Sequence, residues 1–140
     1  MGMGWLTSFS SKTPLSELTI GVIGLGYVGL PTAIGFFDAG FNVWGVDISQ
    51  HSIDLIHRGI NPTGDPDVDD IIPAKGAERW NITSSASQAV PHCDVILVTV
   101  PTPITSESKP DLSYVETAGR DVFNSNPPGT KKIVVHESTV

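Results

Sequence analysis

Three glycines, at positions 24, 26 and 29, most constrain what this chain can fold into, because they occur in the stretch TIGVIGLGYVGLPTAIGFF (residues 19–37). The apolar, β-branched residues before them are typical of a buried strand, and the apolar residues after them recur at helical spacing. At such a junction the first glycine permits a tight turn, the second lets the backbone approach a pyrophosphate, and the third lets the helix pack closely on the sheet. The stretch therefore predicts a strand, a turn and a helix whose N-terminus can bind phosphate.

Asp47 ends the next predicted strand, FNVWGVD, near the offset of about 20 residues at which such sites place an acid that binds the adenosine ribose. A carboxylate there accepts hydrogen bonds from the ribose hydroxyls and repels a 2′-phosphate, so it favours NAD over NADP. Two simpler interpretations stay open: the glycines could only make a sharp turn, and Asp47 could be a solvated strand end or a cap of the next helix. Because the turn and the acid occur together, we predict NAD binding.

Strand-like and helix-like segments alternate along the whole chain. Apolar runs predict strands at residues 18–23, 41–47, 81–85, 94–100 and 132–136. Apolar spacing, caps and glycine stops predict helices at residues 27–39, 49–58, 86–90 and 112–123. Ser49 or Ser52 would cap the second helix and Asp111 the last, while Val28 and Leu112 would lie on buried helix faces. We expect an α/β fold, a Rossmann-type doubly wound parallel sheet with helices on both faces.

The composition fits one folded domain, residues 18–140, after a flexible N-terminal arm, residues 1–17. The chain has 8 Lys and Arg against 15 Asp and Glu, a formal net charge of -7, which argues against nucleic-acid binding. Backbone amides can still hold a phosphorylated ligand. Cys93 is the single cysteine, so no intrachain disulfide can form and a reducing, cytoplasmic location is expected. No apolar stretch approaches the roughly 18 residues of a membrane span, so no membrane partner is expected.

Five strings occur in order along the chain: IGVIGLGYVGLPTA, VDIS, VILVTVPTP, PDLSYVETA and ESTV. Together they resemble the UDP-glucose/GDP-mannose dehydrogenase family from about residue 18 to residue 140. The resemblance implies an NAD-dependent, homo-oligomeric enzyme that oxidises the 6-hydroxyl of a nucleotide-sugar to a carboxylate with two NAD per sugar. Two other functions are possible: the cofactor domain of a β-hydroxyacid dehydrogenase, which the later strings argue against, and a non-catalytic NAD-sensing module.

The resemblance assigns cofactor contacts to particular residues. The pyrophosphate turn would consist of Gly24, Gly26, Tyr27, Val28 and Gly29, and Asp47 would bind the adenosine ribose. Thr102 would lie beside the cofactor, and Thr139 near the nicotinamide, where the family uses a threonine to help hold a catalytic water. Both threonines follow predicted strands, where doubly wound sheets bind ligands. The simpler interpretation of each is a hydroxyl that ties a turn.

Asp65, Pro66 and Asp67 stand where members of the family commonly carry a glutamate-proline pair. This form resembles the branch that acts on UDP-N-acetylhexosamines. The acidic residues at 65, 67, 69 and 70 do not match a calcium loop, which needs Gly and Glu at fixed positions. The histidines have no metal-ligand spacing with Cys93, so we expect no metal site.

The family uses a cysteine nucleophile, which accepts the aldehyde intermediate as a thiohemiacetal. Cys93 precedes a predicted buried strand, at the end of the sheet opposite the expected cofactor. It is therefore expected to be a core residue. In the family the nucleophile, with a lysine and an asparagine, follows the cofactor domain. We thus expect these 140 residues to bind NAD without oxidising a sugar.

Overall fold

A computed structural model describes residues 17–63, 72–101, 106–109 and 111–137. Its strands form one five-stranded sheet in the order β3-β2-β1-β4-β5, and every neighbouring pair is parallel. The strands are β1 (Thr19–Ile23), β2 (Asn42–Val46), β3 (Trp80–Thr83), β4 (Val95–Val98) and β5 (Ile133–His136). The chain winds outward from β1 in both directions, which is the strand order of a Rossmann-type sheet. The predicted fold class is confirmed.

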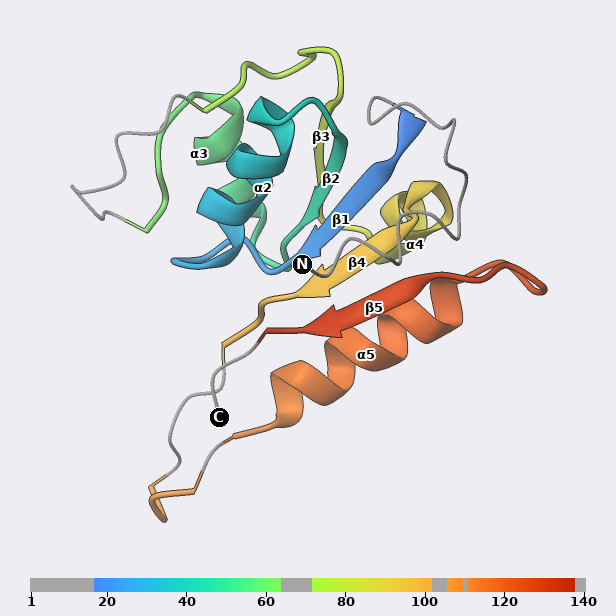
Figure 1. The fold of residues 1–140 in the computed structure, drawn as a ribbon. Coiled ribbons are helices and arrows are strands. Elements are labelled where there is room, and N and C mark those ends of the chain that lie inside the picture. The colour runs from blue at the N-terminus through green and yellow to red at the C-terminus, as the bar shows by residue number, and fades with distance from the viewer. Residues whose placement is uncertain (1–16, 64–71, 102–105, 110, 138–140) are drawn as a thin grey trace.

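Helices cover both faces of the sheet (Figure 1). They are α2 (Gly29–Asp38), α3 (Gln50–His57), α4 (Ala86–Ala89) with the 3₁₀ turn η2 (Val90–His92), and α5 (Ser113–Ser125). Two apolar clusters result. Residues of α2 and α3 pack against one face of the sheet, and residues of α4, η2 and α5 pack against the other. None of the helices that the structure describes combines the length and apolar character needed to cross a bilayer.

The strand register aligns the carboxyl ends of the strands. Ile23 pairs with both Val46 and Val98, and these two pair in turn with Thr83 and His136. The residues that directly follow the five strands are Gly24, Asp47, Ser84, Thr99 and Glu137. These five residues are far apart in the sequence but lie together at one edge of the sheet.

The helix after the glycines begins later than predicted. It starts at Gly29, not at residue 27, with Val28 as its N-cap. Val28 is 51% exposed, so the prediction that it lies on the buried face was wrong. Leu30, Ala33 and Ile34 form that face. The sharp turn set by the glycines rotates the helix, so that the side chain nearest the turn points away from the sheet.

The caps of the other helices differ in part from the predictions. Ser49 caps α3, because its hydroxyl accepts a hydrogen bond from the Ser52 N–H at 3.2 Å. Asp111 does not occupy the cap position of α5, which belongs to Leu112, although its Oδ1 accepts from the Ser113 N–H at 2.9 Å. The hydrogen bonds from Ser113 lower the pKa of Asp111. Leu112 is 42% exposed rather than buried.

Candidate functional site

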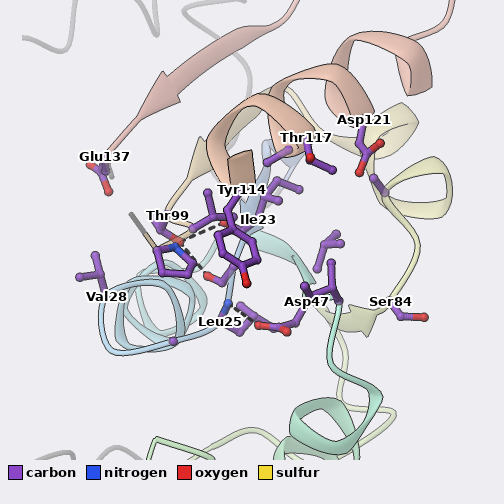
Figure 2. A pocket seen from close by; sticks show the side chains of 18 of the residues that line it. Ile23, Leu25, Val28, Asp47, Ser84, Thr99, Tyr114, Thr117, Asp121 and Glu137 are labelled. Carbon is purple, nitrogen blue, oxygen red and sulfur yellow. Dashed lines mark hydrogen bonds between the residues drawn. The ribbon is translucent and has the colours of Figure 1, made fainter. Parts of the chain in front are cut away.

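A cleft of about 850 Å³ lies at the carboxyl edge of the sheet, within the size range of small-molecule and cofactor sites (Figure 2). The ends of β1, β2, β4 and β5 supply its floor, and α5 supplies one wall. Its lining comprises Ile23, Gly24, Leu25, Gly26, Tyr27, Val28, Val46, Asp47, Ile48, Ser84, Ala86, Thr99, Val100, Pro101, Ser113, Tyr114, Thr117, Ala118, Asp121 and Glu137.

The three glycines have three different geometries. Gly24 has a left-handed φ of +96°, and a Cβ there would lie 3.0 Å from the backbone carbonyl of Thr99. A Cβ on Gly29 would overlap the carbonyl oxygen of Gly24, so the start of α2 can pack this closely only without a side chain. Gly26 lines the cleft and has no atom within 4 Å of a Cβ position. The first and third glycines thus have the turn and packing geometry predicted, and the second leaves open space for a ligand.

Asp47 joins the glycine turn to the end of β2. Its Oδ2 accepts a hydrogen bond from the Leu25 N–H at 2.9 Å, and its Oδ1 accepts from the Ser49 N–H at 2.9 Å. An ionised carboxylate offers about four acceptor positions. Two therefore remain for hydroxyls of a ligand in the cleft. The N-cap residue of α3 is Ser49 rather than Asp47, which contacts that residue only through its backbone N–H.

Tyr27 and Val28 lie at the mouth of the cleft and are 69% and 51% exposed. The Tyr27 hydroxyl donates to the carbonyl oxygen of Thr63 at 3.1 Å, which ties the turn to the segment after α3. Thr102 and Thr139, the other predicted cofactor contacts, lie outside the described residues. The cofactor contacts of all these residues remain predictions.

Residues of α5 that the sequence analysis did not single out also face the cleft. Tyr114, Thr117 and Asp121 project toward it from the helix (Figure 2). Their spacing of three and four residues, beside the buried Ala118 and Val122, could have revealed this polar stripe. Thr99, directly after β4, was likewise missed, since its sequence context is an unremarkable apolar run.

The charged residues that line the described part of the cleft are all acidic: Asp47, Asp121 and Glu137. A phosphate in this cleft would therefore be held by backbone N–H groups at the start of α2, where the helix dipole favours an anion. An additional phosphate near Asp47 would lie beside a carboxylate, and no Lys or Arg is among the described residues that line the cleft. This arrangement suits a dinucleotide without a 2′-phosphate.

Cys93 lies away from the cleft. It is 1% exposed, stands just before β4 at the opposite edge of the sheet, and its Sγ donates to the Ala89 carbonyl oxygen at 3.2 Å. Burial raises the pKa of its thiol to about 12. The expectation that Cys93 is a core residue is confirmed. Among the described residues no group of His, Cys, Asp and Glu side chains is placed to hold a metal ion.

The cleft fits NAD on three observations. Its volume accommodates a large cofactor, the open position at Gly26 lets the backbone approach a pyrophosphate, and Asp47 retains acceptors for ribose hydroxyls. Comparisons with known proteins agree. Residues 18–140 match the NAD binding domain of the UDP-glucose/GDP-mannose dehydrogenase family. This match supports the predicted family over a hydroxyacid dehydrogenase or a sensor module.

Related proteins share both sequence and fold. UDP-N-acetyl-D-mannosamine dehydrogenase of Escherichia coli K12 is 40% identical over 127 residues, which cover 89% of this chain and 29% of that protein. The structure of a UDP-glucose dehydrogenase from Pyrobaculum islandicum superposes with a TM-score of 0.80 at 31% identity, covering 91% of this chain and 31% of that one. The structure of GDP-mannose dehydrogenase from Pseudomonas aeruginosa superposes with a TM-score of 0.78 at 33% identity, covering 86% of this chain and 28% of that one.

The chain thus spans less than a third of the length of these relatives. All the strands and helices that the structure describes nevertheless fall within the family match, and the cleft has open space at Gly26 for a pyrophosphate. The chain belongs to the UDP-glucose/GDP-mannose dehydrogenase family, of which it contains the NAD-binding domain.

Proposed function

We propose that this domain serves the oxidation of the 6-hydroxyl of a UDP-sugar to a carboxylate. NAD, when bound, supplies the hydride acceptor for two successive oxidations, alcohol to aldehyde and then aldehyde plus water to carboxylate, so that two NAD are reduced and three protons are released per sugar. The observation that carries the proposal is the junction of the glycine turn with Asp47, 2.9 Å from Leu25 N to Asp47 Oδ2, at the floor of the cleft.

The residues of the turn bind and orient the cofactor in this proposal. The backbone at Gly26, Tyr27 and Val28 and the N-terminus of α2 hold the pyrophosphate, supported by the packing of Gly24 against Gly29. Asp47 accepts hydrogen bonds from the adenosine ribose. Thr102 and Thr139, which follow β4 and β5 in the sequence, would also contact the cofactor, Thr139 near the nicotinamide, as the resemblance implies.

The cofactor part of the proposal is tested by calorimetric titration of the chain with NAD and with NADP. We expect NAD to bind more tightly, and Asp47→Ala to weaken NAD binding by roughly tenfold or more, because a charged acceptor is lost. Asp54→Ala is the matched control, since Asp54 is exposed on α3, outside the cleft. Equal affinity for NADP, or equal effects of the two substitutions, would contradict the assignment of Asp47.

For the substrate we propose a UDP-N-acetylhexosamine. The support is the 40% identity to the E. coli UDP-N-acetyl-D-mannosamine dehydrogenase and the Asp65–Pro66–Asp67 string, which lies outside the described residues. The test is NADH formation by the protein that carries this domain, with UDP-N-acetylmannosamine, UDP-N-acetylglucosamine, UDP-glucose and GDP-mannose compared at equal concentration. Fastest turnover of UDP-glucose or GDP-mannose would exclude this branch.

By themselves, the 140 residues are expected to bind NAD without oxidising a sugar, because their single thiol, that of Cys93, is buried away from the cleft. NADH production from any UDP-hexose by this chain alone would contradict that expectation. For the full-length protein the proposal also includes homo-oligomerisation, which light scattering can test, and a cytoplasmic location, in keeping with a free, buried cysteine.

A further inference from the structure

The peptide between Gly24 and Leu25 is held by a side chain on each side. Its carbonyl oxygen accepts a hydrogen bond from Thr99 Oγ1 at 2.7 Å, and its N–H donates to Asp47 Oδ2 at 2.9 Å (Figure 2). In a trans peptide the C=O and N–H point in opposite directions. Thr99, after β4, and Asp47, after β2, therefore fix this peptide from opposite sides.

Thr99 is the buried polar residue at the centre of this arrangement. It is 9% exposed, and every other side chain buried to this degree in the described chain is apolar. Its hydroxyl oxygen lies 2.7 Å from the Gly24 carbonyl oxygen and 3.1 Å from the Ile23 carbonyl oxygen. The Ile23 carbonyl oxygen already accepts a hydrogen bond from the Thr99 backbone N–H at 2.8 Å. With one hydroxyl proton, the shorter contact is the effective donor bond. A buried hydroxyl is costly unless hydrogen-bonded, so this contact defines its orientation.

The same hydroxyl also touches the start of α2. A Cβ on Gly29 would lie 2.5 Å from Thr99 Oγ1, so the atom sits against both the first and the third glycine of the turn. Thr99 thus contacts β1, the turn and α2 at once. The glycine motif itself does not predict a threonine at this position.

We propose that Thr99 is a positioning residue for cofactor binding, acting through the Gly24–Leu25 peptide on Asp47. By donating to the carbonyl, Thr99 fixes the peptide plane and polarises it, which strengthens the Leu25 N–H bond to the carboxylate. Asp47 is then held at Oδ2 by Leu25 and at Oδ1 by Ser49, with its remaining acceptors directed to the ribose. This inference rests on the proposed role of Asp47 in NAD binding.

The test compares NAD and NADP affinities of Thr99→Val and Thr99→Ser by calorimetry. Thr99→Val removes the hydroxyl but keeps the β-branch, and we expect the Kd for NAD to rise about 5- to 10-fold, the worth of one net hydrogen bond. The preference for NAD over NADP should fall with it. Thr99→Ser retains the donor and should restore most of both. Thr99→Ala against Thr99→Ser gives a second pair that differs only in the hydroxyl.

A double-mutant cycle separates positioning from a general structural role. In an Asp47→Asn background, Thr99→Val should change the Kd for NAD less than twofold, because the group on which it acts is already altered. An equal effect of Thr99→Val in both backgrounds would overturn the proposal. It would also be overturned if Thr99→Ser folds while both Thr99→Val and Thr99→Ala fail to fold, because the hydroxyl would then be needed for folding.

The outcomes distinguish this inference from the proposed function. If the unmodified chain does not bind NAD, or if Asp47→Asn binds NAD as tightly, the proposed cofactor site fails. If NAD binding depends on Asp47 while Thr99→Val binds NAD with unchanged affinity and selectivity, only the role of Thr99 is overturned.

Discussion

Gly29 packs so closely against Gly24 that a single added carbon at Gly29 would overlap the Gly24 carbonyl oxygen. The contact joins the first residue of α2 to the first residue after β1. It sets the angle at which the helix leaves the sheet, and so directs the helix N-terminus over the cleft. The phosphate-binding geometry therefore depends on the absence of a side chain in two places.

Gly29→Ala should destabilise the chain by about 2–3 kcal/mol, because the new methyl group must displace backbone atoms rather than a flexible side chain. Urea unfolding followed by circular dichroism measures the change. The control is Gly35→Ala in the same helix, where a Cβ meets nothing within 4 Å. It should stabilise the chain by about 0.5–1 kcal/mol through helix propensity. Similar stabilities of the two variants would contradict the packing role of Gly29.

Gly26→Ala should separate binding from stability. A Cβ at Gly26 has open space, so the free energy of unfolding should change by no more than about 0.5 kcal/mol. The methyl group would nevertheless occupy the space that the pyrophosphate needs, and the affinity for NAD should fall at least about tenfold. Unfolding and calorimetric titration of the same preparation test both parts. Undiminished NAD binding would show that the cofactor does not approach the backbone here.

Arg79 is expected to be a main determinant of stability on the α2 side of the sheet. Its Nη1 donates to the carbonyl oxygens of Phe37 at 3.1 Å and Phe41 at 3.0 Å, and its guanidinium carbon lies 4.6 Å from the centre of the Phe37 ring. Arg79→Met keeps much of the apolar stem but leaves both carbonyls without this donor, so we expect a loss of about 1.5–3 kcal/mol.

Arg58→Met, at an exposed position after α3, is the control for Arg79→Met and should change stability by no more than about 0.5 kcal/mol. Arg79→Lys should recover little, because an ammonium lacks the planar fork of donors and stacks less well on an aromatic ring. Equal unfolding midpoints in urea for the two methionine variants would show that the Arg79 contacts contribute nothing.

Cys93 makes stability depend on pH in the alkaline range. Burial raises the pKa of its thiol from 9.0 to about 12, partly opposed by the charge of Lys132. The folded chain thus holds this proton more tightly than the unfolded chain. The associated stability is complete below about pH 9 and is lost as the pH rises from about 9 toward about 12.

Unfolding free energies measured from about pH 8 to pH 10.5 should therefore fall more steeply for the unmodified chain than for Cys93→Ala. The slopes are compared rather than the absolute values, because the substitution also leaves a small cavity. Parallel pH profiles for the two chains would show that the thiol does not contribute. In the folded chain the thiol should also resist alkylation at neutral pH, since little thiolate is present.

Local pattern identified most elements correctly because their determinants are local. The apolar run before Gly24 and the positive φ that a tight turn requires both follow from the sequence around residues 19–29. Ser49 as a cap also depends only on neighbours. The error at Val28 arose because apolar spacing carries no information on close packing: Val28 has the spacing of a buried residue but is exposed, since α2 begins only at Gly29, which packs against Gly24 and Thr99.

The sequence by itself determined the family, the α/β class, the glycine turn and the acid at the end of the second strand. Only the tertiary structure shows which side chains meet when β1 lies between β2 and β4, the order of the predicted Rossmann-type sheet. That order brings Asp47 and Thr99, 52 positions apart in the sequence, to opposite sides of one peptide. It also places the polar stripe of α5 over the same cleft. These contacts depend on which strands are neighbours in the sheet, and no local sequence pattern carries that information.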